Sequence, residues 1–149
     1  MSAEDYELLK LENQLCFPLY VCSKEVVRRY KPLLDGLGLT YTQYIAMMAL
    51  WEHGSLSVKD LGGLLYLDSG TLTPLLKKLE EKGFVARSRD AGDDRVVIVS
   101  VTPEGKALRD RARIVPESMA SCLSLPKEDA EELQRILKKM RGGFRDPPY

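Results

Sequence analysis

The chain has 149 residues, with 22 lysines and arginines balanced by 22 aspartates and glutamates, so its formal net charge at pH 7 is zero. This length suits one domain, and a hydrophobic content of 44% is enough to build a core. No apolar run approaches the roughly 18 residues that cross a bilayer, and the N-terminus lacks the layout of a secretory signal. Three cysteines without paired spacing argue against a disulfide scaffold or a zinc site. We therefore expect one cytoplasmic domain, residues 1–149, with no cofactor, no metal and no membrane partner.

The N-terminal third has a helical pattern. Apolar residues at steps of three and four predict helix over residues 3–35. Pro18 interrupts this pattern, because proline has no backbone N–H and crowds the preceding turn, so we expect either a kink or two helices that meet there. Two glycines then mark a turn, and Thr40 is a typical N-cap for a second helix that ends at Gly54.

The middle third predicts a compact DNA-binding unit. Residues 55–66 predict a short helix, and after a tight turn residues 70–83 predict a second helix that ends at its terminal glycine. Two β-rich runs, 84–90 and 95–102, flank a short Gly-Asp-Asp tip and predict a hairpin. A helix, turn, helix and hairpin in this order are typical of a winged helix-turn-helix, which we assign to residues 40–102.

The C-terminal third returns to helix. Thr102 is the expected N-cap of a helix that bends at Pro116, and residues 124–140 predict a last helix. Cys122 precedes this last helix in a loop-like stretch.

Both ends of the chain carry apolar helical faces that have no partner within the chain. We therefore expect residues 3–35 and 103–141 to form the helical interface of a dimer. The fold class is mainly α, with a small β-hairpin wing.

The second helix of the middle third has the composition of a recognition helix. Such a helix offers short polar groups to base edges and basic groups to phosphates, while a wing offers arginine to the minor groove. A capped amphipathic helix with a solvated lysine pair is the alternative interpretation. The candidate DNA-binding residues are Asp68, Ser69, Thr71, Thr73, Lys77, Lys78, Arg87 and Arg95.

The charge of this module restrains that hypothesis. Residues 57–100 contain seven basic and seven acidic residues, so the module has no net positive charge. Its positive groups must therefore gather on one face, or its binding to DNA must be weak and strongly dependent on salt.

Cys16 is the candidate reactive thiol. A lone cysteine at helical spacing among apolar residues is often a small buried hydrophobe, which is the alternative here. Tyr20 lies one turn on, however, and Tyr30 and Tyr41 would be within reach in a compact fold. Phenol groups donate hydrogen bonds to a thiolate and so stabilise it. Cys22 points elsewhere on a regular helix, and we assign it a structural role.

These motifs together carry a resemblance to a known family. From about residue 9 to residue 140 the sequence resembles the MarR family of dimeric winged-helix regulators, and within it the organic-hydroperoxide-sensing repressors of the OhrR type. The motifs are KLENQLCFPLY around Cys16, RRYKPLLDGLGLTYTQY, the triplet WEH, LYLDSGTLTPLLKKLE, and the DDR wing that ends at Arg95. Pro18 departs from the family pattern, in which an aliphatic residue is expected.

The resemblance implies a function and a mechanism. It implies a homodimer that binds a pseudo-palindromic double-stranded operator while Cys16 is reduced, with Tyr30 and Tyr41 hydrogen-bonded to the sulfur. Oxidation by an organic hydroperoxide would then release the DNA. Cys122 falls where some members carry a second cysteine that forms a disulfide with the sensing cysteine of the other subunit. It is therefore the candidate resolving residue, unless its position is incidental.

Three other functions stay open from the sequence. A regulator of this kind can respond to a small aromatic ligand without covalent chemistry. It can also respond to another oxidant, such as hypochlorite or disulfide stress. A thiol peroxidase is the enzymatic alternative, but we recognise no reductase-binding motif to support it, so we expect a regulator rather than an enzyme.

Overall fold

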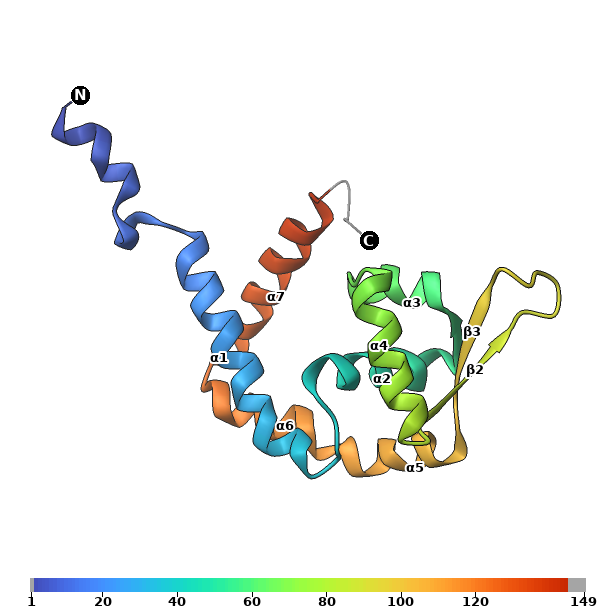
Figure 1. Cartoon of the computed structure of the whole chain (residues 1–149). Helices are drawn as coiled ribbons and strands as arrows, with labels where there is room; N and C mark the ends of the chain where they lie inside the picture. Colours follow the sequence, from blue (N-terminus) through green and yellow to red (C-terminus); the bar gives the residue numbers. More distant parts are fainter. Residues whose placement is uncertain (1, 145–149) are drawn as a thin grey trace.

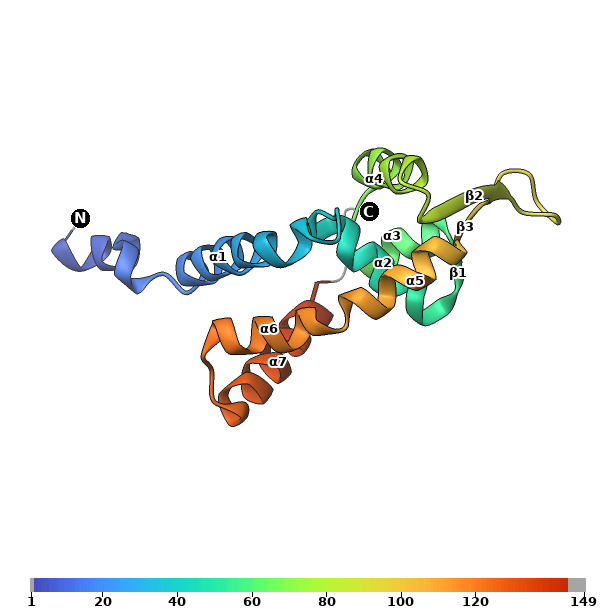
Figure 2. The same cartoon turned by 90° about the horizontal axis from the view of Figure 1, so that it is seen from below.

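The computed structural model describes residues 2–144 of the chain, and Figure 1 shows its elements in sequence colours. They are η1 (Ala3–Leu9), η2 (Leu11–Asn13), α1 (Cys16–Asp35), α2 (Tyr41–His53), β1 (Ser55–Ser57), α3 (Val58–Leu65), α4 (Ser69–Glu81), β2 (Val85–Arg89), β3 (Val97–Val101), α5 (Pro103–Ala112), α6 (Ile114–Leu123) and α7 (Lys127–Gly142). In both views α1, α6 and α7 lie to one side of a module that contains α2, α3, α4 and the sheet (Figures 1 and 2).

The core is centred on this module and extends to α1, α5 and α6. Met47, Leu50, Leu61, Leu79 and Val99 are all completely buried, and they come from α2, α3, α4 and β3. The helices of the module thus pack against one another and against the central strand of the sheet.

Local capping signals determine where the helices start. The side chain of Thr40 accepts a hydrogen bond from the backbone of Gln43, and that of Thr102 accepts one from the backbone of Gly105. Ser57 and Asp68 cap α3 and α4 in the same way. These side-chain oxygens satisfy N–H groups that have no partner within the helix, which is why the starts predicted at Thr40 and Thr102 are confirmed. Helix α4 begins at Ser69, one residue before the predicted start, because Asp68 caps it.

The sheet has one strand more than the sequence predicts. Its order is β1–β3–β2, all antiparallel, and β1 pairs with β3 with Leu56 opposite Val99. The predicted hairpin of β2 and β3 is confirmed. The third strand was missed because three residues are too few to show an alternating pattern, and only the distant β3 makes them a strand.

Two kinds of helix meet just before Pro18, at Gln14 and Leu15. Residues 3–13 contain the short 3₁₀ helices η1 and η2, and α1 begins at Cys16. Pro18 is therefore the third residue of α1, where a backbone N–H has no partner within the helix in any case. Of the two expectations at this proline, two helices that meet there is the correct one.

Two expectations for the C-terminal third are wrong. The helix breaks at Arg113 instead of bending at Pro116. A proline ring crowds the carbonyl four residues earlier, which here belongs to Ala112, the last residue of α5. Cys122 lies in the last turn of α6 and not in a loop before the last helix.

The terminal helices bury little apolar surface within the chain. Every residue from 120 to 144 is exposed, and Leu133, Ile136 and Met140 on α7 keep 44%, 46% and 38% of their surface open. Leu8 and Leu15, in the segment that leads into α1, are each 81% exposed. Helix α6 packs against α1, but the apolar faces of α1 and α7 stay largely uncovered.

Gly105 at the start of α5 has no room for a side chain. A methyl group there would overlap the carbonyl oxygen of Phe84, and the Gly105 carbonyl also accepts a 2.8 Å hydrogen bond from Trp51 Nε1. We expect Gly105→Ala to lower the free energy of unfolding by about 1–3 kcal/mol, measured by urea denaturation at fixed protein concentration. Gly63→Ala on α3 is the control, because a methyl group there meets no atom within 4 Å and should be neutral or stabilise by about 0.5–1 kcal/mol. A Gly105→Ala protein as stable as the parent would contradict the packing described here.

Candidate nucleic-acid interface and thiol site

Helix α4 has one buried face and one exposed polar face. Leu72, Leu75, Leu76 and Leu79 are buried against the core. The exposed residues of the helix include Ser69, Thr71, Thr73, Lys77 and Lys78, all of them predicted DNA-binding residues. The structure thus presents three hydroxyl groups near the N-terminal end of α4 and two ammonium groups one turn or more further on.

Asp68 forms the N-cap of α4. Its Oδ1 accepts a 2.7 Å hydrogen bond from the backbone N–H of Thr71, and this bond holds the pKa of the Asp68 carboxyl below its usual value. The carboxylate is therefore ionised at neutral pH, which suits the positive end of the helix dipole. Its role is to fix the first turn of α4, on which Ser69 and Thr71 are carried.

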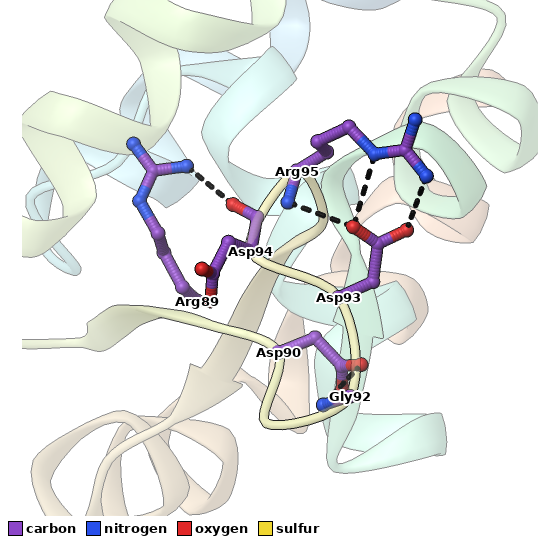
Figure 3. Close-up of polar contacts among 6 residues, drawn as sticks. All are labelled: Arg89, Asp90, Gly92, Asp93, Asp94 and Arg95. Atoms are coloured by element: carbon purple, nitrogen blue, oxygen red, sulfur yellow. Dashed lines mark hydrogen bonds and ion pairs between the residues drawn. The ribbon is translucent and has the colours of Figure 1, made fainter.

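The tip of the hairpin is braced by its own charged groups (Figure 3). Arg95 donates from Nε and Nη2 to the two carboxylate oxygens of Asp93 at 3.1 and 3.3 Å, which lowers the pKa of Asp93. Arg89 donates to the backbone carbonyl of Asp94 at 2.7 Å. The Arg95 side chain is nevertheless 91% exposed. The guanidinium is therefore oriented by the hairpin and still open to a partner.

Arg87 has a different environment from Arg95. It lies on β2 and donates from Nη2 and Nε to the carboxylate of Glu80 on α4, at 3.2 and 3.4 Å, while its backbone N–H also donates to Glu80. The side chain of Arg87 is only 28% exposed, and the contact lowers the pKa of Glu80. This ion pair attaches the hairpin to α4, which the sequence spacing did not indicate.

Several acidic side chains of the module accept hydrogen bonds from groups of the module itself, which affects how its neutral net charge is distributed. The carboxylates of Asp68, Glu80 and Asp93 are each occupied by a donor of the same module. Lys77 and Lys78 are exposed on α4. Positive charge can therefore face outward although the acidic and basic residues are equal in number.

Cys16 is exposed at the first position of α1, one turn from Tyr20 but far from Tyr30 and Tyr41 of its own chain. Tyr30 lies on the same helix, and the 14 residues from position 16 to position 30 span about 21 Å of helix axis. The expectation that Tyr30 and Tyr41 approach Cys16 within one compact chain is therefore wrong. The alternative that Cys16 is a buried hydrophobe does not hold within the chain either.

The tyrosines instead form a cluster where α1 meets α2. The ring of Tyr30 lies 4.9 Å from that of Tyr41 and 5.7 Å from that of Tyr44, measured between centroids. Burial raises the pKa of all three phenols, and the neighbouring rings add to this effect for Tyr30. The phenols therefore stay protonated and remain hydrogen-bond donors. Tyr44 was not predicted as part of this cluster, although it lies one turn from Tyr41 on the same helix.

A cleft opens beside this cluster. It has a volume of about 270 Å³ and is lined by Val27, Leu34, Leu39, Thr40 and Tyr41, with charged residues of α1 around it. Its apolar lining and the adjacent phenol make it suited to an apolar segment that carries one polar atom.

The remaining thiols are also accessible. Cys22 and Cys122 are both free and exposed. Cys22 lies six residues after Cys16, about 9 Å along the helix axis, which exceeds the reach of a disulfide without unwinding. Within residues 2–144 no cluster of histidine, cysteine, aspartate or glutamate could hold a metal ion. No helix in this part of the chain is long and apolar enough to cross a membrane.

Comparison with known proteins places the chain among transcriptional regulators. Residues 28–112 match the family described as transcriptional regulator SarA/Rot. The organic hydroperoxide resistance transcriptional regulator of Bacillus subtilis is 47% identical over 131 residues, which cover 88% of this chain and 87% of that protein.

Solved structures agree with this placement. Reduced AbfR of Staphylococcus epidermidis bound to DNA superposes with a TM-score of 0.77 at 33% identity, over 95% of this chain and 99% of that one. The disulfide form of AbfR superposes with a TM-score of 0.64 at 36% identity, over 94% of this chain and 98% of that one. A mutant of MarR from Escherichia coli in complex with operator DNA superposes with a TM-score of 0.78 at 25% identity, over 85% of this chain and 92% of that one.

Proposed function

Because this chain belongs to the MarR family of winged-helix transcriptional regulators, we propose that it is a homodimeric repressor that senses organic hydroperoxide through Cys16. It binds operator DNA while Cys16 is reduced and releases it after oxidation. The observation that carries the proposal is an exposed thiol on the same helical surface that a second subunit would cover. The similarity to the organic hydroperoxide resistance regulator of Bacillus subtilis favours peroxide, rather than a non-covalent ligand, as the signal for this chain. It also favours a regulator over a thiol peroxidase. A repressor of this kind acts in the cytoplasm, where its operator lies.

The dimer interface is assigned to the two ends of the chain. Residues 3–35 and 103–141 carry the exposed apolar side chains of α1, α6 and α7, whereas residues 40–102 contain most of the buried core. Burial of apolar surface is the main favourable contribution to association, so a second copy that covers these faces stabilises both chains. A two-fold arrangement buries the same surface on each subunit.

The thiol site is completed across this interface. Since Tyr30 of the same chain lies about 21 Å along α1 from Cys16, the phenols that meet the sulfur come from the partner subunit. An antiparallel pairing of the two α1 helices brings the Cys16 end of one to the Tyr30 and Tyr41 cluster of the other. The apolar cleft beside Tyr41 then receives the first turn of the opposite α1, including Phe17.

The chemistry follows from this arrangement. The Cys16 thiolate, stabilised by phenol O–H donors, attacks one oxygen of the hydroperoxide. A sulfur–oxygen bond forms, the oxygen–oxygen bond breaks, and the alcohol leaves after it takes up a proton. The resulting sulfenic acid condenses with the thiol of Cys122 from the partner subunit, so that a disulfide forms and water leaves.

DNA is read by α4 and the wing. Ser69, Thr71 and Thr73 face base edges in the major groove, Lys77 and Lys78 face phosphates, and Asp68 holds the first turn in place. Arg95 enters the minor groove, with Arg87 at the base of the wing. Two such modules in one dimer fit a pseudo-palindromic operator whose half-sites lie about one helical turn apart.

The first prediction separates affinity from specificity. Arg95→Ala should weaken binding to an operator selected from random duplexes, and the slope of log Kd against log salt should fall by about one unit, because one cation is lost. Thr71→Ala should instead reduce discrimination between operator and random DNA. Fluorescence anisotropy at several salt concentrations measures both effects, with Arg109→Ala on α5 as the control. Parent-like affinity and specificity in both variants would refute this assignment of the surface.

The second prediction concerns activation of the thiol. Tyr30→Phe combined with Tyr41→Phe should slow alkylation of Cys16 by iodoacetamide at pH 7 about tenfold or more, because hydrogen bonds to a charged sulfur are lost. Peptide mass spectrometry follows Cys16 separately from the other two thiols. Alkylation of the exposed thiol of Cys22 in the same sample is the internal control and should proceed as in the parent. If the double variant also reacts at the parent rate, the phenols do not activate Cys16.

The third prediction tests the fate of the oxidised sulfur. Cumene hydroperoxide should convert the protein into a covalent dimer on non-reducing gels, reversibly with dithiothreitol, and Cys122→Ser should abolish this band. Cys22→Ser is the control and should leave the band unchanged. A parent protein that stays monomeric on the gel and carries only small-thiol adducts on Cys16 would show that Cys122 does not resolve the sulfenic acid.

A further inference from the structure

The turn that joins α1 to α2 is held by two cations from distant elements. The carbonyl of Gly36 accepts a 2.6 Å hydrogen bond from Arg111 Nη2, and the carbonyl of Gly38 accepts one from Lys82 Nζ. Both carbonyls lie at the C-terminal end of α1, where the helix dipole favours a positive charge. Arg111 belongs to α5, whereas Lys82 is the C-cap of α4.

Lys82 also contacts Gln43, two residues after Tyr41 on α2. Its Nζ donates to Oε1 of Gln43 at 3.0 Å, and this amide is buried, with 4% of the residue exposed. The same oxygen accepts a 3.1 Å hydrogen bond from the backbone N–H of Thr40, and Gln43 donates back to the Thr40 hydroxyl. One ammonium group therefore joins α4 directly to the capping box that starts α2 and positions Tyr41.

The place of Lys82 on α4 differs from that of the DNA-reading residues. Asp68 caps the first turn of α4 and Lys82 follows its last residue, so about 20 Å of helix axis separates them. The acceptors of Lys82 Nζ are oxygens of the α1–α2 turn and of α2. Lys82 thus contacts the turn before α2 and the first turn of α2, which carries Tyr41, whereas Lys77 and Lys78 belong to the predicted DNA-facing surface.

We propose that Lys82 is the positioning residue through which a change at the tyrosine cluster is transmitted to α4, an inference that rests on the proposed function. Displacement of Tyr41 moves Thr40 and Gln43, and Lys82 then moves the C-terminal end of α4 with them. The contact changes operator affinity because it has a different free energy in the reduced and the oxidised protein. This difference is what a variant without the contact loses.

The test compares operator Kd for reduced and cumene hydroperoxide-oxidised protein, using the full-length chain. In Lys82→Met the ratio of oxidised to reduced Kd should fall about fivefold or more, the size of an ordinary coupling. The salt dependence of the reduced protein should stay unchanged, since no phosphate contact is lost. Gln43→Met should lower the ratio in the same way, and the double variant should lower it no further, because the two residues act as one unit. Lys82→Arg, which keeps the cation, should restore most of the ratio.

Arg111→Met is the matched control, because it removes a cation from the same turn without touching α4. The ratio of oxidised to reduced operator Kd in this variant should equal that of the parent. Thermal unfolding of every variant identifies any general loss of stability. An unchanged ratio in Lys82→Met, an equal fall in Arg111→Met, or a reduced-state salt slope lower by about one unit in Lys82→Met would each overturn the inference while the proposed function stands. Retention of the operator by oxidised parent protein would overturn the proposed function itself, and this inference with it.

Discussion

The rest of the structure depends on apolar surface that one copy of the chain leaves uncovered. The apolar side chains of α7 and of the N-terminal part of α1 stay open to solvent within residues 2–144, although the winged module has a closed core. Hydrophobic burial is the main favourable contribution to association, so these faces favour binding of a second subunit that covers them. In the proposed mechanism the thiol site needs the same partner, because the helix that carries Cys16 holds Tyr30 far from it. Assembly and sensing thus depend on the same surface.

Because the winged module has no net charge, its binding to DNA depends on how its DNA-facing groups are oriented. A strongly basic protein keeps much of its affinity for DNA whatever its orientation, since contacts with phosphates require little alignment. Here the seven basic residues of the module are matched by seven acidic ones, so no net positive charge attracts DNA in every orientation. A small change in the position of α4 relative to its symmetry mate therefore removes a large share of the binding free energy. The Glu80–Arg87 ion pair keeps α4 and the wing together as one unit during such a change.

The junction of α1 and α2 is where the two halves of the proposed mechanism meet. The tyrosine cluster lies at this junction, and so do the carbonyls that accept hydrogen bonds from α4 and α5. Because Tyr41 lies between Thr40 and Gln43, the path from a phenol to the recognition helix is only a few residues long. A short, hydrogen-bonded path of this kind can carry a displacement without reorganising the core.

Features that depend on near neighbours follow from the sequence alone. Thr40 and Thr102 mark helix starts and Gly54 marks a helix end, because capping and a left-handed backbone need only residues within one turn. The hairpin and the polar face of α4 follow from equally local patterns. The local sequence is therefore sufficient to name the candidate DNA-binding residues.

The meeting of distant groups, in contrast, is a property of the folded chain. Folding makes a strand of Ser55–Ser57 through pairing with β3, and it gives Arg87 an ion pair with Glu80. It also produces one unbroken helix from Cys16 through Tyr30, a length that depends on where the chain breaks near Pro18. Strand pairing and side-chain contacts depend on where remote segments of the chain come to lie, and no local spacing in the sequence records this.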